Sequence, residues 1–447
     1  MTESLLRRIL RELAALAQLA WPMVVVNLSY IGMRFTDTVF AGQLSPEDLG
    51  AVSVGGDLWM PVTLFNMGVL MAVSPLAAHA FGAGDRLLVA SIVRQAAWVA
   101  LAGSLLGILV LAQAGTVMTA IGVAPELIPK AAGYARGISW GLPAIMLFYV
   151  LRFASEAVSY TRPLLLVAVA GLLFNAFADW VLMYGKLGFP RLGAVGTGYA
   201  SALSQWVMFL VLLSQVRRAP LFRPFRLFEK FEWPRWSMIR EQLGLGVPIA
   251  VSVFMEGGLF SAVGLLMATL GTTAVAGHQI AVNWGALMFM VPLGLAAGIT
   301  VRVGQALGRG KPDEARFAGA SGLVLCVGFM AVSALCMLAF RKHIVGLYTD
   351  DPAVTAMAMS LLFVAAAFQL FDGLQVGAAG VLRGYKDTRV PMIMTLIAYW
   401  GIGFQVAWLT GIRQQGGPVW VWIGLVAGLC AAGLMLVGRF WWRHVRR

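Results

Sequence analysis

Long stretches without a charged side chain recur along the whole sequence. They cover residues 95–125, 192–216, 257–301, 317–340, 390–412 and 414–438. A helix that crosses a bilayer needs about 20 mostly apolar residues, so most of these stretches are long enough for one span. The stretch at 257–301 is long enough for two spans, separated by a turn at Gly271-Thr272-Thr273. The pattern therefore predicts membrane-spanning helices.

About twelve such helices fit the whole chain. We place them near residues 13–40, 50–78, 90–114, 131–153, 161–184, 194–216, 242–270, 275–301, 317–340, 354–382, 391–412 and 417–440. Composition agrees, because 60% of the residues are hydrophobic and only 12% are charged, whereas a soluble domain carries about 25% charged residues. The predicted fold class is an all-α integral membrane protein.

The net charge of +13 raises the question of a nucleic-acid partner, and its distribution argues against one. The N-terminus, the C-terminus and the even-numbered connections hold 25 of the 33 Lys and Arg residues, seven of them in the connection at 217–241. Cations gather on the cytoplasmic side of membrane proteins. We expect both termini in the cytoplasm, a bacterial-style inner membrane and no bound nucleic acid. No cleavable signal peptide is expected, because the first apolar run continues as a full span.

The sequence repeats itself with a shift of 226 residues. Pro22 falls on Pro248, and Gly82-Ala83-Gly84-Asp85 falls on Gly308-Arg309-Gly310-Lys311. With a drift of one or two residues, Thr161-Arg162-Pro163 also falls near Thr388-Arg389-Val390-Pro391. Six spans per repeat give both halves the same orientation, which predicts two six-helix lobes related by a pseudo-twofold axis along the membrane normal. We assign the lobes to residues 1–220 and 242–447, joined by a cytoplasmic basic and aromatic connection at 221–241.

Three carboxylates lie in otherwise apolar, membrane-length segments. Asp37 lies late in the first span, Glu256 early in the seventh and Asp372 within the tenth. A charge at mid-bilayer costs about 2.5–3.5 kcal/mol even on the lenient insertion scale, so such residues usually mark ion, proton or substrate pathways. Gln369 and Gln375 lie three residues to either side of Asp372, on the same helix face. These positions predict a transporter.

Several motifs resemble one family. The runs FQLFDGLQ at 368–375 and GVLRGYKDT at 380–388 resemble the tenth span and following loop of MATE multidrug exporters of the NorM branch. DTVFAG at 37–42 and AGHQIAVN at 276–283 resemble that branch too, and the resemblance covers nearly the whole chain in order. It implies a central cleft between two lobes and export of drugs or toxic organic cations against inward flow of Na⁺ or H⁺. It implies no cofactor and no catalytic residue.

The resemblance also implies two cation sites. Glu256 and Asp372 match the site of the C-terminal lobe, where they are candidate Na⁺ ligands and Phe289 stands where relatives place an aromatic ring. Phe368 stands where some relatives carry a Tyr, so the choice between Na⁺ and H⁺ stays open. The matching residues of the N-terminal-lobe site are Asp37, Asn175, Asp179 and Ser201. Phe289, Phe368, Gln369 and Gln375 are also candidates for lining a substrate cleft.

Arg34 departs from the family pattern, because relatives generally have a small residue there. It lies three residues before Asp37, where an ion pair on one helix face is available. Such a pair would keep Asp37 ionised and reduce its use as a proton carrier. Glu156 lies near a span end, where we expect a solvated carboxylate without a function.

Two other classes of function are weaker. A lipid-linked-precursor flippase of the same superfamily would need several mid-span Arg, and only Arg34, Arg136 and Arg152 qualify. An intramembrane enzyme would need a nucleophile–base pair or a metal cluster, and the sequence spacing indicates neither. We therefore expect a monomeric transporter in the lipid bilayer, with small organic molecules as its partners.

Overall fold

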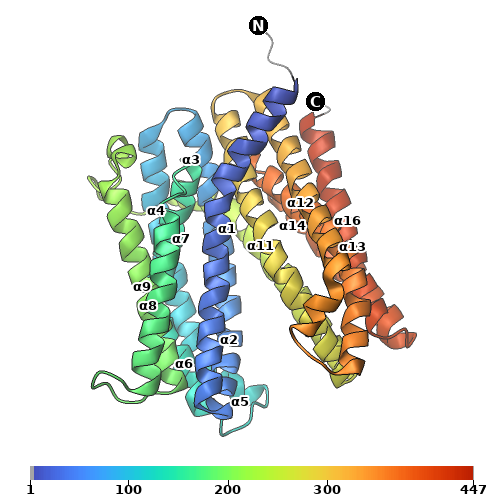
Figure 1. The fold of residues 1–447 in the computed structure, drawn as a ribbon. Helices are drawn as coiled ribbons and strands as arrows, with labels where there is room; N and C mark the ends of the chain where they lie inside the picture. Colours follow the sequence, from blue (N-terminus) through green and yellow to red (C-terminus); the bar gives the residue numbers. More distant parts are fainter. Residues whose placement is uncertain (1–4, 446–447) are drawn as a thin grey trace. The chain divides into compact units, whose positions relative to one another are not determined.

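The structure, a computed structural model, describes residues 5–445, and the described chain consists of helices joined by short connections (Figure 1). The first half contains α1 (Leu5–Leu44), α2 (Pro46–Leu70), α3 (Val73–Gly82), α4 (Arg86–Ala112), α5 (Ala114–Ala120), α6 (Ile128–Ser139), α7 (Leu142–Ala157), α8 (Leu164–Tyr184), α9 (Ala194–Arg218) and η1 (Pro220–Phe225). The second half contains α10 (Trp236–Thr269), α11 (Thr272–Gly308), α12 (Pro312–Gly346), α13 (Pro352–Gly384), α14 (Arg389–Leu396), η2 (Ile397–Gly403), α15 (Phe404–Val406), η3 (Ala407–Arg413), α16 (Pro418–Phe440) and η4 (Trp441–Val445).

The number of spans agrees with the hydropathy pattern. Among the described residues, 11 helical segments are long and apolar enough to cross a membrane, or 12 if the bent pair α6 and α7 is one span. The prediction of an all-α membrane protein with about twelve spans is thereby confirmed. The turn expected between the seventh and eighth spans is also present, since α10 ends at Thr269 and α11 begins at Thr272.

The fourth span is the main departure from the expected helices. Instead of one helix over 131–153, α6 and α7 meet at an angle of 45° around Trp140. Pro143 in the first turn of α7 lacks a backbone N–H and cannot continue a helix from α6. A Cβ on Gly141 would lie 2.8 Å from the Cα of Ala202 in α9, so glycine permits the close packing at this bend.

The internal repeat is visible in matching turns. Gly84 and Gly310 both have left-handed backbones, with φ of 79° and 71°. The following residue closes each turn from its backbone N–H: Asp85 donates to the Ala80 carbonyl and Lys311 to the Ala306 carbonyl, each at 3.0 Å. This is the usual hydrogen bond of a helix that ends in a left-handed residue.

A second pair of matching turns follows α7 and α13. Ser159 and Lys386 are 227 residues apart and have φ of 61° and 58°, which is uncommon for residues other than glycine. In each case the next residue donates to a carbonyl five positions back, at 2.8 Å for Tyr160 and 2.9 Å for Asp387. The two halves therefore end corresponding helices with the same backbone geometry.

Contacts divide the chain into two compact units. One unit contains the chain up to Val24 and from Val251 onward, and the other contains Val25–Ala250. Helices α1 and α10 are each divided between the units, so the boundaries differ from those of the expected lobes at 1–220 and 242–447. That lobe assignment and the axis relating the lobes stay predictions.

The early part of α1 is held in the first unit by α11. Leu16 and Ala20 belong to the same apolar core as Leu295 and Ile299. Arg302 in α11 donates from Nε and Nη2 to the two carboxylate oxygens of Glu12, at 2.9 and 2.6 Å. This two-point ion pair fixes the start of α1 on α11.

Candidate functional site

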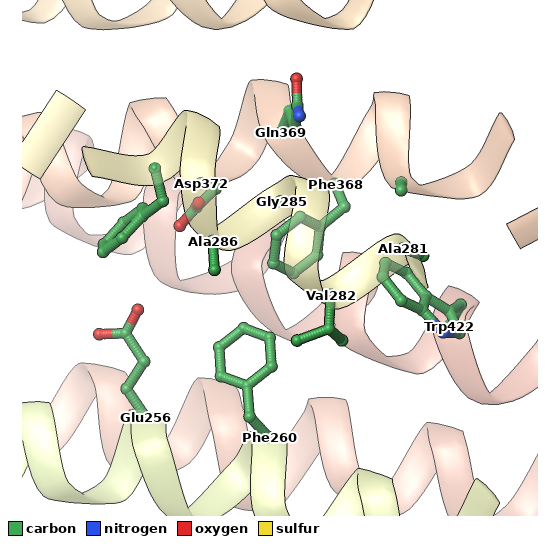
Figure 2. Close-up of a pocket in the computed structure, with 12 residues that line it drawn as sticks. Glu256, Phe260, Ala281, Val282, Gly285, Ala286, Phe368, Gln369, Asp372 and Trp422 are labelled. Atoms are coloured by element: carbon green, nitrogen blue, oxygen red, sulfur yellow. The ribbon is translucent and has the colours of Figure 1, made fainter. Parts of the chain in front are cut away.

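Glu256 and Asp372 line one cavity inside the unit that begins at Val251. The cavity has a volume of about 140 Å³, and in Figure 2 Glu256 projects from α10 and Asp372 from α13 toward the same space. Drug-sized pockets usually measure about 300–1,000 Å³, so this cavity suits an ion with a few waters. Its lining residues are Glu256, Phe260, Ala281, Val282, Gly285, Ala286, Phe289, Ala365, Phe368, Gln369, Asp372 and Trp422.

The negative charges of Glu256 and Asp372 have few neighbouring groups that would stabilise them. Asp372 is only 4% exposed and Glu256 is half-buried. Neither forms a hydrogen bond or ion pair with another described residue, although Arg383 acts on Glu256 through its charge. Glu256 and Asp372 are also close enough to repel each other when both are ionised. Because two neighbouring negative charges with little compensation are unfavourable, the arrangement is suited to a bound proton or a bound cation.

The amide side chains beside Asp372 are buried and incompletely satisfied. Gln369 is 1% exposed and Gln375 is 4% exposed, and the Oε1 atom of each has no hydrogen-bond partner among the described residues. Free carbonyl oxygens are ligands that hard cations accept. The sequence prediction that both Gln share a region with Asp372 agrees with this placement, but only Gln369 lines the cavity itself.

Tyr399 is a site residue that sequence reasoning missed. Its side chain is fully buried, and it interacts electrostatically with Glu256 and Asp372. Its hydroxyl lies near Gln375, without hydrogen-bond geometry to any described residue. Tyr399 belongs to the π-helical segment η2 (Ile397–Gly403), where side chains do not follow the 3.6-residue period. The signal in the sequence that could have identified Tyr399 is that it is the only Tyr in the apolar stretch 390–412.

Aromatic rings form one wall of the cavity. The Phe368 ring packs edge-on against Phe260 and Trp422, with centroids 5.9 and 5.8 Å apart. The Trp422 indole Nε1 donates to Nδ1 of His278 at 3.1 Å, which fixes the orientation of this ring. Phe289, from α11, also lines the cavity. Ring faces attract cations, so this wall is compatible with an ion or an organic cation.

A second polar cluster lies in the unit Val25–Ala250. Asp37 in α1 is 6% exposed and accepts hydrogen bonds from Asn175 Nδ2 in α8 and Ser201 Oγ in α9, each at 3.1 Å. Asp179 is fully buried, and neither of its carboxylate oxygens has a hydrogen-bond partner among the described residues. The structure thus brings together all four residues of the expected N-terminal-lobe group. Thr197, which sequence reasoning missed, is fully buried and interacts with Asp179.

The ion pair between Arg34 and Asp37 that their spacing allows does not form within the described chain. Arg34 is exposed, and its Nη1 lies 2.9 Å from the sulfur of Met60 in α2. Asp37 is turned instead toward α8 and α9, where two neutral donors occupy its oxygens. Packing of α1 against α8 and α9 decides this orientation, because spacing on one helix does not fix which neighbours a side chain meets.

The expectation that Glu156 is a solvated carboxylate is wrong. Rather than being solvated, Glu156 is 1% exposed, and its Oε1 accepts from Arg152 Nε at 2.8 Å. Arg152 Nη2 also donates to Asn27 Oδ1 at 2.9 Å. Arg152 is therefore neutralised inside the unit Val25–Ala250 and is not a free cation. The pair lies in α7, in which every residue except Pro143 and Leu147 is buried.

Comparison with known proteins identifies relatives over nearly the whole chain. The MatE family model matches residues 22–181 and 248–409, so its two matches begin at Pro22 and Pro248, the positions that the internal repeat pairs. Multidrug resistance protein PmpM of Pseudomonas aeruginosa is 43% identical over 434 residues, which are 96% of this chain and 91% of that protein. Multidrug resistance protein MdtK of Yersinia pseudotuberculosis is 40% identical over 436 residues, which are 96% of this chain and 95% of that one.

Solved structures show the same fold. The crystal structure of the eukaryotic MATE transporter AtDTX14 matches with a TM-score of 0.88 at 21% identity, covering 96% of each chain. A transporter of the MOP superfamily from Pyrococcus furiosus, described as having a binding pocket of reverse polarity, matches with a TM-score of 0.84 at 20% identity, covering 96% of this chain and 95% of that one.

Proposed function

The chain belongs to the MatE family of membrane transporters, and from this premise we propose that it is a multidrug exporter driven by Na⁺ or H⁺. Family membership makes it a multi-pass transporter and not an enzyme. The relatives PmpM and MdtK carry the name multidrug resistance protein, which supports organic drugs or toxic organic cations as substrates. We place the protein in an inner membrane with both termini in the cytoplasm, acting as a monomer.

The observation that carries ion coupling is the cavity shared by Glu256 and Asp372. Two carboxylates that repel each other, with little neighbouring positive charge, gain most from a bound proton or cation. The cavity volume of about 140 Å³ fits an ion with a few waters. We therefore assign this pair as the coupling site, with Phe289 as a neighbouring ring that is available for a cation–π contact.

Coupling requires that ion and drug differ in their preference for two conformations. In the proposed cycle, an external ion occupies the Glu256 and Asp372 site and favours release of drug to the outside. Return to the inward-facing state delivers the ion to the cytoplasm. The free energy of coupling is then the difference in ion affinity between the two states, and it acts reciprocally on the drug.

The cluster around Asp37 supports a second coupling site in the unit Val25–Ala250. Asp179 is buried beside Asp37, and neither of its carboxylate oxygens forms a hydrogen bond with a described residue, although the Thr197 hydroxyl lies nearby. A pair of neighbouring carboxylates holds one proton, or one cation, more readily than two full charges. The donors Asn175 and Ser201 hold Asp37 in place, so Asp179 is the member of the pair that is free to gain a proton.

A transport assay in vesicles identifies the coupling ion. Reconstituted protein is loaded with ethidium, and transport is followed with either a Na⁺ gradient or a pH gradient imposed, in buffers that hold the other ion equal on both sides. Transport driven by one gradient alone identifies the ion, and transport independent of both gradients would contradict the proposed coupling.

The flippase alternative is not favoured by the placement of cations. A diphosphate headgroup needs several unpaired cations in a cleft. Arg152 is already paired with Glu156, and Arg34 contacts the sulfur of Met60. Arg136 is exposed on the surface of α6. None of these three residues offers a buried, free cation to a diphosphate.

A further inference from the structure

The proposed transport cycle makes no use of residues 217–240, the basic strap that links α9 to α10. Its cations are Arg217, Arg218, Arg223, Arg226, Lys230, Arg235 and Arg240, against the carboxylates Glu229 and Glu232. A connection of this composition is usually solvated and irregular. In the structure it is instead packed against the rest of the unit Val25–Ala250, with one face turned toward that unit and one face turned outward.

The inward face is apolar. Phe222, Phe225 and Leu227 are 4%, 1% and 6% exposed and belong to the main core of the unit Val25–Ala250. The Phe222 ring packs edge-on against Tyr160 with centroids 5.3 Å apart. The Phe225 ring stacks on Phe81 at 6.2 Å. These side chains attach the first part of the strap to the helix bundle.

A polar clamp attaches the second part to α4. Glu232 accepts from Ser91 Oγ at 2.6 Å and from Arg94 Nη2 at 2.7 Å. Gln95 donates to the Trp233 carbonyl at 3.0 Å and accepts from the Arg235 backbone N–H at 2.7 Å. Because α4 supplies all three side chains, the strap has a defined conformation before any ligand arrives.

The outward face combines cations with aromatic rings. All seven cations of the strap are exposed, and the side chains of Arg218, Arg223, Lys230 and Arg240 form no ion pair with a described residue. Phe231, Trp233 and Trp236 are 72%, 74% and 69% exposed. The strap lies at the membrane surface, since candidate spans end at Arg218 and begin again at Trp236. Trp at this level and free cations are the combination that anionic bilayers attract.

We propose that the basic strap is a preformed docking surface for the headgroups of anionic phospholipids. The free cations bind the phosphates, and the exposed rings of Phe231, Trp233 and Trp236 enter the headgroup layer. A soluble acidic protein would not account for the three bulky rings that lie just before and at the start of the span that begins at Trp236. The clamp on Glu232 reduces the ordering that binding would otherwise require.

Lipid retention tests this surface directly. The variant Arg218→Gln/Arg223→Gln/Lys230→Gln is compared with wild type in mixed micelles of phosphatidylglycerol and phosphatidylcholine, with bound lipids counted by native mass spectrometry. Each cation near an anionic surface contributes about fivefold in affinity, so we expect the preference for phosphatidylglycerol to fall at least about tenfold. High salt should reduce the wild-type preference as well, because it screens exposed charges.

A charge-matched control separates the strap from net charge. The variant Arg341→Gln/Lys342→Gln/Arg413→Gln removes three cations elsewhere and should keep the wild-type preference. An equal loss in both variants, or no loss in the strap variant, would overturn the proposal.

A second measurement uses the protein with its cations intact, in case the triple variant does not fold. Trp236 fluorescence, taken as the difference between wild type and Trp236→Phe, should be quenched more by dibrominated phosphatidylglycerol than by dibrominated phosphatidylcholine. Equal quenching by the two lipids would also refute anionic selectivity. Neither readout depends on drug export, so failure of the docking surface leaves the transport proposal untouched.

Discussion

Replacing Glu232 by Gln removes the charge at the centre of the clamp while keeping its shape. The side chain accepts hydrogen bonds at 2.6 Å from Ser91 and at 2.7 Å from Arg94, and the Arg94 and Glu232 side chains are only 14% and 13% exposed. A hydrogen bond to a charged group contributes about 1.5–3 kcal/mol and a neutral one about 1 kcal/mol. In the Gln variant an NH₂ group replaces one carboxylate oxygen, so either Ser91 or Arg94 faces a donor where it had an acceptor. We expect the strap to lose about 2 kcal/mol of local stability, roughly a 30-fold rise in opening.

Hydrogen exchange measures this opening. Peptides covering 221–235 should exchange roughly 30-fold faster in Glu232→Gln at pH 7, whereas peptides from α8 should be unchanged. Glu229→Gln is the matched control three residues away. Its ion pair with Arg226 spans 3.5 Å between side chains that are 61% and 63% exposed, and exposed pairs of this kind contribute about 0–1 kcal/mol. If Glu229→Gln opens the strap as much as Glu232→Gln does, the clamp is not what holds the strap.

The same clamp predicts a pH dependence. Burial alone would raise the pKa of Glu232, but the hydrogen bond from Ser91 and the charges of Arg94 and Arg235 hold this pKa below its ordinary value of 4.5. A lowered pKa in the folded state means that the stabilisation is present above pH 4.5 and is lost as the pH falls through the folded value. After correction for intrinsic exchange, protection of the strap should be constant from pH 8 to pH 5 and fall below about pH 4.5. Glu232→Gln should show no such fall, and a fall that persists in this variant would contradict the assignment.

Further variants test the coupling residues, the topology and the buried ion pair. Asp372→Asn should abolish ion-driven ethidium efflux while the protein still inserts and purifies normally; efflux at the wild-type rate would remove Asp372 from the coupling site. Arg34→Gln should shift the pH profile of efflux only slightly, because Arg34 does not pair with Asp37 within the described chain and acts on it only through its charge; a shift of about one pH unit or more would show a direct pairing. Ser237→Cys in a Cys-free background should resist an impermeant thiol reagent in intact cells, and ready labelling would reverse the proposed orientation. Glu156→Gln leaves a buried guanidinium without its counter-charge and should cost about 3–5 kcal/mol, seen as a lower melting temperature in detergent; an unchanged melting temperature would show that the pair is not stabilising.

Local properties of the sequence were sufficient to predict the membrane spans and to single out Asp372. A membrane helix must be long and apolar by itself, so the hydropathy of each segment predicts it without knowledge of its neighbours. Asp372 was recognisable for the same reason, since no other charge lies between Pro352 and Leu382. The repeat was also readable, because Gly84 and Gly310 mark turns whose geometry depends on a few adjacent residues.

Partners across helices were decided only by tertiary packing. The side chains that donate hydrogen bonds to Asp37 lie 138 and 164 residues away in the sequence. Arg34, only three residues away, contacts Met60 instead. Tyr399 approaches Glu256 and Asp372 from a π-helical segment, and Glu232 accepts a hydrogen bond from Ser91, which lies 141 residues away in the sequence. A helix sequence specifies which residues share a face, but the rotation of that face is set by the shapes of the helices that pack against it. Long-range contacts therefore determined which polar groups are paired and which have no partner.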